Sequence, residues 1–84
     1  MKAKQFYSKN QIVITDDDGS RYLQSYNSMI AKIDAQGNVT LDEKFWDYSV
    51  TTGTYRNRFL GDSGKAVTQG KIDSGEYKLD NLNK

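Results

Sequence analysis

Residues 41–61, with the sequence LDEKFWDYSVTTGTYRNRFLG, carry the strongest structural signal in this chain. They contain its single Trp, two of its three Phe and two of its six Tyr, together with two Arg. Asp42 is a favourable helix N-cap, and Leu41, Phe45 and Tyr48 recur at helical spacing around it. We therefore expect a short helix over residues 43–48.

A second helix is expected directly after this one. Ser49 and the two threonines that follow offer capping hydroxyls, Tyr55 and Phe59 lie four residues apart, and Gly61 is a typical residue to end a helix. A third helix over residues 63–73 is weaker, because each of the two glycines inside it costs about 1 kcal/mol relative to Ala. The pattern predicts two or three short helices in this part of the chain.

The residues before this segment favour strands. Residues 11–15, QIVIT, form a β-branched run that ends in Asp-Asp-Asp-Gly, a sequence typical of a hairpin turn. Residues 21–33 read as a long second strand whose alternation fails near Asn27, so we expect a bulge or a break there. After a turn at residues 35–38, residues 39–41 form a third short strand. Residues 11–41 thus predict a three-stranded antiparallel meander.

The expected fold is a single α+β domain: a three-stranded antiparallel β-meander followed by two or three short helices and a docked C-terminal arm or strand. A basic N-terminal arm over residues 1–10, with Lys2, Lys4 and Lys9, is expected to be a solvated end that frays. The meander occupies residues 11–41, the helical part residues 42–75, and the C-terminal arm residues 76–84.

The composition excludes most catalytic chemistry. The chain has neither Cys nor His, which removes catalytic triads, imidazole acid-base pairs and nearly all transition-metal sites. Glu43 and Asp47 share one face of the first expected helix and could hold Mg²⁺, but acidic residues there are more simply a solvated face that suits the helix dipole. We expect no enzyme activity, no cofactor and no metal site.

The charge balance also limits the partners. Twelve basic and eleven acidic residues give a formal net charge of +1, too small for a long-range field that attracts a polyanion. Binding of nucleic acid would therefore need a local basic patch. The longest apolar run is only a few residues, far below the roughly 20 that span a membrane. We expect a cytoplasmic protein, a monomer or a small homo-oligomer, without membrane contact.

Exposed Tyr and Trp side chains next to Arg are typical of protein interfaces. The second expected helix also carries the side chains that a recognition helix uses on phosphates and base edges. The alternative is that the rings only cover the edge of the core. The candidate partner contacts are Tyr26, Trp46, Tyr48, Thr51, Thr52, Tyr55, Arg56, Asn57 and Arg58.

Three blocks of sequence resemble an uncharacterised family of small domains encoded by phages, plasmids and other mobile elements of Firmicutes. The blocks are QSYNS at residues 24–28, the pattern WDYS-x-TT-x-x-YRN-x-FL at residues 46–60, and a closing Leu82-Asn83. The chain departs from the family at Gly53-Thr54, where helix-favouring residues are expected. The resemblance implies no known activity.

The resemblance does imply a biological context, since small phage and mobile-element proteins commonly bind a host protein complex and block it. Our leading hypothesis is a non-enzymatic binding protein with a host protein or ribonucleoprotein complex as partner, such as an inhibitor of a host defence nuclease (an anti-CRISPR-like protein acting on a CRISPR-Cas effector). The alternative is a small helix-turn-helix-like DNA-binding protein in mobile-element regulation or maintenance, with nucleic acid as its partner.

Overall fold

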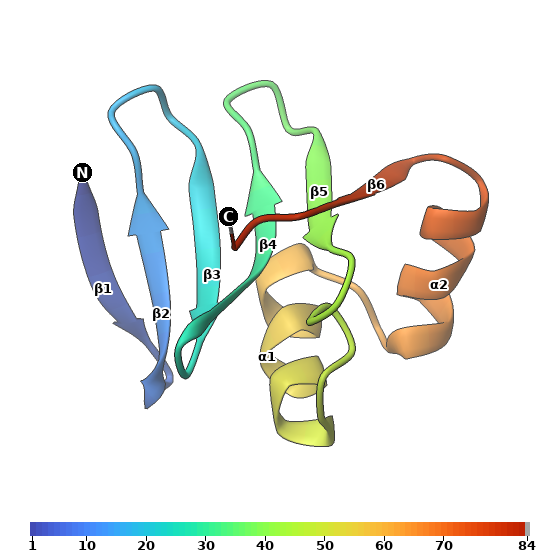
Figure 1. The fold of residues 1–84 in the computed structure, drawn as a ribbon, viewed down its shortest axis with the longest axis horizontal. Helices are drawn as coiled ribbons and strands as arrows, with labels where there is room; N and C mark the ends of the chain where they lie inside the picture. The colour runs from blue at the N-terminus through green and yellow to red at the C-terminus, as the bar shows by residue number, and fades with distance from the viewer. Residues whose placement is uncertain (84) are drawn as a thin grey trace.

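The computed structural model describes residues 1–83 as one six-stranded sheet and two helices (Figure 1). The strands are β1 (Lys2–Phe6), β2 (Ser8–Thr15), β3 (Arg21–Ser25), β4 (Ser28–Ile33), β5 (Val39–Asp42) and β6 (Tyr77–Asp80). The helices are α1 (Val50–Leu60) and α2 (Lys65–Asp73). The strands lie in sequence order, antiparallel from β1 to β5, and β6 runs parallel to β5.

The expectation of a three-stranded meander followed by helices is wrong, because the fold is mostly a mixed sheet of six strands. The long strand predicted over residues 21–33 is two strands, β3 and β4, joined by a turn at Tyr26 and Asn27. Tyr26 lies at φ 55°, a left-handed conformation that ends the extended run. The break expected near Asn27 is thus a complete reversal of the chain, and it adds one strand to the meander.

The N-terminal arm expected to fray is also a strand. Lys2 pairs with Thr15 and Lys4 with Val13, so residues 2–6 form the edge of the sheet as β1, and β2 already begins at Ser8. Alternating Lys side chains are common on edge strands, where their charge discourages pairing with another chain. Charge in this segment therefore marks an edge strand, and it does not indicate a disordered end.

The helix expected over residues 43–48 does not form, and these residues make consecutive turns. Asp42 does act as a cap, since its Oδ2 accepts hydrogen bonds from the amides of Lys44 (3.0 Å) and Phe45 (2.9 Å). Its Oδ1 accepts from the amide of Leu82 at 2.8 Å. Burial alone raises the pKa of Asp42, but these amide donors outweigh it and the pKa lies below its usual value. The carboxylate joins the turns to the C-terminal segment.

Other local predictions are confirmed. The Asp-Asp-Asp-Gly run is the turn of the β2–β3 hairpin, closed by the amide of Gly19 on the carbonyl of Asp16 at 3.1 Å. Ser49 caps α1, and Gly61 ends it in the left-handed conformation at φ 76°. The weaker third helix is α2, and the C-terminal arm docks as β6.

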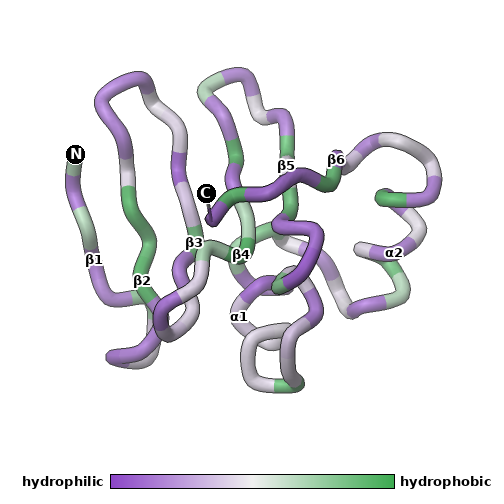
Figure 2. The backbone as a smooth tube through the Cα atoms, in the orientation of Figure 1, coloured by the Kyte–Doolittle hydropathy of each residue, from purple (hydrophilic) through white to green (hydrophobic). Residues whose placement is uncertain are grey.

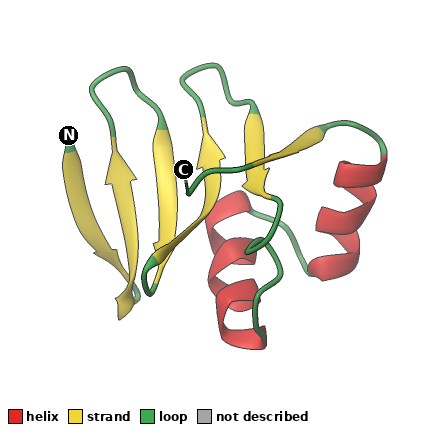
Figure 3. Cartoon of the chain, viewed as in Figure 1, coloured by secondary structure: helices red, strands yellow, loops and turns green. Residues whose placement is uncertain are grey.

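The two helices lie in the crossover between β5 and β6; α1 packs on one part of the sheet, and α2 lies beside β6 (Figure 3). The core between the sheet and α1 consists of Leu23, Ile30, Ala31, Leu41, Phe59 and Tyr77. Hydrophobic residues concentrate in β2, β4 and β5, whereas β1 is mostly hydrophilic (Figure 2). Within residues 1–83, neither helix has the length and apolar character needed to cross a membrane.

Candidate functional site

The sheet face that α1 packs against continues beyond the helix onto β1 and β2, where neither α1 nor α2 covers it. Lys2 and Lys4 pair with Thr15 and Val13, and these pair in turn with Arg21 and Leu23. Directly paired residues point to the same side of a sheet, so the three strands present one continuous face. This face and the side of α1 enclose a groove of about 870 Å³.

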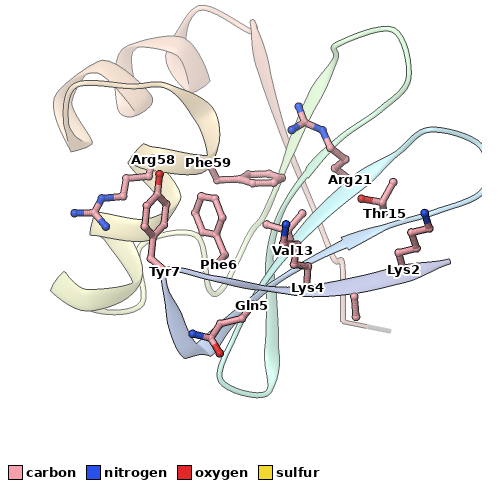
Figure 4. Close-up of a pocket in the computed structure, with 11 residues that line it drawn as sticks. Lys2, Lys4, Gln5, Phe6, Tyr7, Val13, Thr15, Arg21, Arg58 and Phe59 are labelled. Atoms are coloured by element: carbon pink, nitrogen blue, oxygen red, sulfur yellow. The ribbon is translucent and has the colours of Figure 1, made fainter.

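We call this groove the β1–α1 groove (Figure 4). It is lined by residues 2–7 of β1 and the turn after it, by Val13 and Thr15 of β2, by Arg21 of β3, and by Arg58 and Phe59 of α1. Its cations are Lys2, Lys4, Arg21 and Arg58, and no carboxylate of residues 1–83 lines it. Since the whole chain carries +1, the residues outside the groove sum to −3. The chain is nearly neutral in total, but its positive charge is concentrated in the groove. The groove is therefore a local basic patch of the kind that binding of a polyanion requires.

The groove cations remain available to a ligand. All four are exposed, and within residues 1–83 none of them forms an ion pair. Two lie against aromatic rings instead. The guanidinium carbon of Arg58 is 4.6 Å from the ring centroid of Tyr7, and that of Arg21 is 5.7 Å from that of Phe59. Such contacts orient a guanidinium without neutralising its charge.

Tyr7, at the turn between β1 and β2, is held in an unusual conformation. Its φ is 67° and its side chain is 69% exposed. Residues other than Gly and Asn reach the left-handed region only at a steric cost, and a large exposed ring gains little burial there in return. The ring packs edge-on against Phe6, with centroids 4.7 Å apart. Figure 4 shows Tyr7 beside Arg58 at one end of the groove.

A cluster of polar residues fixes the opposite side of α1, and Arg56 is its centre. Arg56 is 1% exposed; its Nη1 donates to the carbonyl of Trp46 at 2.6 Å and its Nη2 to Oδ1 of Asn57 at 3.0 Å. The guanidinium carbon lies 5.2 Å from the Trp46 ring, and Nη1 is 3.5 Å from Asp47. Burial lowers the pKa of Arg56, and Asp47 opposes this shift. Asp47 also pairs with Lys65, so both oxygens of this candidate metal-binding carboxylate already face cations.

Ser49 and Thr52 of the 46–60 sequence block anchor the N-terminus of α1 to the sheet. The hydroxyl of Ser49 accepts from the amide of Thr52 at 3.1 Å and donates to its hydroxyl at 3.2 Å. The Thr52 hydroxyl lies 3.0 Å from the hydroxyl of Ser25 on β3. Gly53 lies against the guanidinium of Arg56, whose Nη2 would be 3.5 Å from an added Cβ. The residues shared with the QSYNS and WDYS-TT-YRN patterns therefore hold α1 in place.

A second buried polar centre joins α2 to β6. The Asp62 carboxylate accepts hydrogen bonds from Nζ of Lys71 (2.8 Å), the hydroxyl of Thr68 (2.8 Å) and the hydroxyl of Tyr77 (3.1 Å). Burial alone raises the pKa of Asp62, but the three donors outweigh it and the pKa lies below its usual value. Because all these groups satisfy one another, this centre is a structural joint between the helix and the strand.

The predicted contact residues fall into two groups. Thr52 and Arg56 are buried, and Trp46, Tyr55 and Asn57 are partly buried in the packing of α1. Tyr26, Tyr48, Thr51 and Arg58 are exposed. Of the exposed residues, Arg58 lines the groove. A role in partner binding stays a prediction for all nine, but Thr52 and Arg56 present no accessible side chain for it.

Sequence reasoning did not place Lys2, Lys4, Tyr7 or Arg21 of the groove among the partner contacts. One signal was available, because Lys2 and Lys4 alternate with Ala3 and Gln5 at the period of a strand with one charged face. Arg21 and Arg58 are 37 positions apart in the sequence, and only the fold brings them to one groove.

Comparison with known proteins gives one match. The model of a family of unknown function, DUF8033, matches residues 1–75. No curated protein and no solved structure matches the chain. The family match includes β1, both helices and two of the three sequence blocks that pointed to an uncharacterised family of small domains. The chain therefore belongs to the DUF8033 family.

Proposed function

We propose that this chain is a non-enzymatic binding protein of a phage or other mobile element, and that it docks on an anionic host macromolecule through the β1–α1 groove. The observation that carries the proposal is the groove itself, in a chain of net charge +1: it has four exposed cations and, among the residues that the structure describes, no carboxylate. The lack of His and Cys in the sequence supports binding over catalysis. The targets to test first are host defence nucleases that carry nucleic acid, such as CRISPR-Cas effectors.

The helix-turn-helix alternative is less well supported by the side chains of α1. Arg56, one of its two guanidiniums, is enclosed between Trp46 and Asn57. Arg58 is exposed, and it lines one end of the groove beside the ring of Tyr7 (Figure 4). A recognition helix would carry the positive charge on its own surface. Here the exposed positive charge comes from the sheet and from α1 together, which supports docking through the groove.

The test is a quantitative pull-down from a Firmicutes lysate at physiological salt with three proteins. They are the native chain, a groove variant with Lys4→Glu and Arg58→Glu, and a control with Lys32→Glu and Lys78→Glu. Both variants change the net charge equally, and neither control residue lines the groove. We expect the partner to be recovered with the native and control chains and lost with the groove variant. Equal recovery with all three chains would exclude the groove as the docking surface.

A further inference from the structure

We propose that the β1–α1 groove binds single-stranded nucleic acid, with phosphates at Lys2, Lys4, Arg21 and Arg58 and an unpaired base stacked on Tyr7. This inference rests on the proposed function and names the chemistry of the anionic partner. It commits to one occupant because the groove combines positive charge with an exposed aromatic ring, the two features that sequence-tolerant binding of single strands requires.

The cations are spread along the groove and do not converge on one point (Figure 4). Lys2 and Lys4 lie on the same face of β1, about 7 Å apart along the strand. Arg21 and Arg58 line the same groove from β3 and α1, so positive charge lies on both of its sides. Such an arrangement follows a chain of phosphates, whereas a single small anion would need the cations to converge on one point. The absence of a carboxylate among the lining residues removes local repulsion.

The rings explain why the strand should be single. Tyr7 is 69% exposed at one end of the groove, beside the partly exposed Phe6. Stacking on such a ring needs a base whose face is free, and in a duplex both faces are covered by the neighbouring base pairs. An acidic peptide could satisfy the cations, but it would leave the exposed part of the Tyr7 ring in water.

The backbone of Tyr7 supports a role for its side chain in binding. At φ 67°, Gly or Asn would be less strained. A non-Gly residue kept in a strained conformation at an exposed site suggests that its side chain is used. The strain also supplies a variant that should fold well, because Tyr7→Gly relieves it.

The experiment measures fluorescence anisotropy of labelled oligothymidylate and oligouridylate of about 12 nucleotides, a length within the site sizes of small single-strand binders. A duplex of the same length and polyglutamate serve as competitors. We expect at least one single strand to bind, and neither competitor to displace it at equal charge concentration. Tyr7→Gly should weaken binding about tenfold, as expected for loss of one stacked base, without lowering the melting temperature.

Charge is tested separately with a matched pair of variants. Arg58→Gln should reduce the slope of log affinity against log salt by about 0.7, the value for one phosphate contact on a single strand. Lys32→Gln is the control, because Lys32 also lies over a ring, that of Tyr22 at 5.6 Å, but does not line the groove. Its slope should equal that of the native chain.

Three results would overturn the inference: no binding of either single strand at low salt, equal competition by duplex or polyglutamate, or native affinity in Tyr7→Gly. If one of them appears while the groove variant still loses its partner in the pull-down, the proposed function stands and only the nucleic acid assignment fails. If the groove variant also retains its partner, both proposals fail.

Discussion

One face of the sheet is covered by a helix in one half and left open in the other. Over β3, β4 and β5, α1 covers the face, and Leu23, Ile30 and Leu41 are at most 1% exposed beneath it. Over β1 and β2, the face has no helix above it, and Lys2, Lys4 and Thr15 are exposed. We call these the covered half and the open half.

The two halves differ in whether their charged side chains are buried and paired or exposed and unpaired. In the covered half, the buried Arg56 donates to Trp46 and Asn57 through its two Nη atoms, while its Nε has no partner within residues 1–83. The buried Asp62 carboxylate accepts from Lys71, Thr68 and Tyr77. In the open half, the cations are exposed, and within residues 1–83 they form no ion pair. A buried charge must be paired to be tolerated, whereas an exposed unpaired charge remains free to bind. The covered half is thus held together by paired buried charges, and the open half carries the surface for which we propose binding.

The largest expected effect is on the free energy of unfolding, and it distinguishes two residues that pair directly across β2 and β3. Leu23 is 0% exposed, whereas its partner Val13 is only partly buried. Leu23→Ala should lower the free energy of unfolding by about 4 kcal/mol because it leaves a cavity. Val13→Ala should cost about 1 kcal/mol. Urea denaturation measures both, and equal losses would mean that the two halves are packed alike.

The next comparison separates two arginines of the same helix. Arg56→Ala should cost about 3 kcal/mol of stability, since it removes a buried charged donor and leaves the carbonyl of Trp46 unpaired. Arg58→Ala should change stability by about 1 kcal/mol or less, the scale of an exposed cation–π contact, while weakening ligand binding. Thermal unfolding and binding assays on both variants check this. The reverse pattern would mean that Arg56 contributes more to binding than to stability.

A smaller effect concerns acid stability. The folded-state pKa of Asp62 lies below its unfolded value of about 3.9. Its contribution to stability is therefore fully present above the unfolded pKa and is lost as the pH falls through the folded pKa. Asp62→Asn should cost about 2 kcal/mol at pH 7 and less at pH 3, when measured by urea denaturation at both values. Tyr77→Phe, which removes one donor, should lie between the native chain and Asp62→Asn; a cost that is independent of pH would contradict the assignment.

The smallest effect should be stabilising. Gly70 lies inside α2 with open space around the position of an added Cβ. Gly70→Ala should raise the free energy of unfolding by about 0.5–1 kcal/mol through helix propensity. If the two halves act independently, ligand affinity of the groove should not change. A change in affinity would show that the helices of the covered half influence the groove.

Prediction from the sequence was most successful where local chemistry decides. The capping of α1 by Ser49, its end at Gly61 and the hairpin turn at residues 16–19 depend on neighbouring residues alone, and all are confirmed. Prediction was wrong where a residue also bonds a partner that is distant in the sequence. Asp42 was expected to start a helix, but its carboxylate is also bonded by the amide of Leu82, 40 residues away, and the segment after it forms turns.

For the candidate site, the sequence by itself established the chemistry: no His, no Cys, a net charge near zero, and aromatic and Arg residues concentrated in residues 41–61. Only the tertiary structure decided which of these residues are accessible. Arg56 and Arg58 are two positions apart and therefore point about 200° apart on a helix, so one is buried and the other exposed. Which one faces the sheet depends on strand pairing and helix docking. The groove exists because residues 2–21 and 58–59, remote in the chain, meet across an uncovered sheet face.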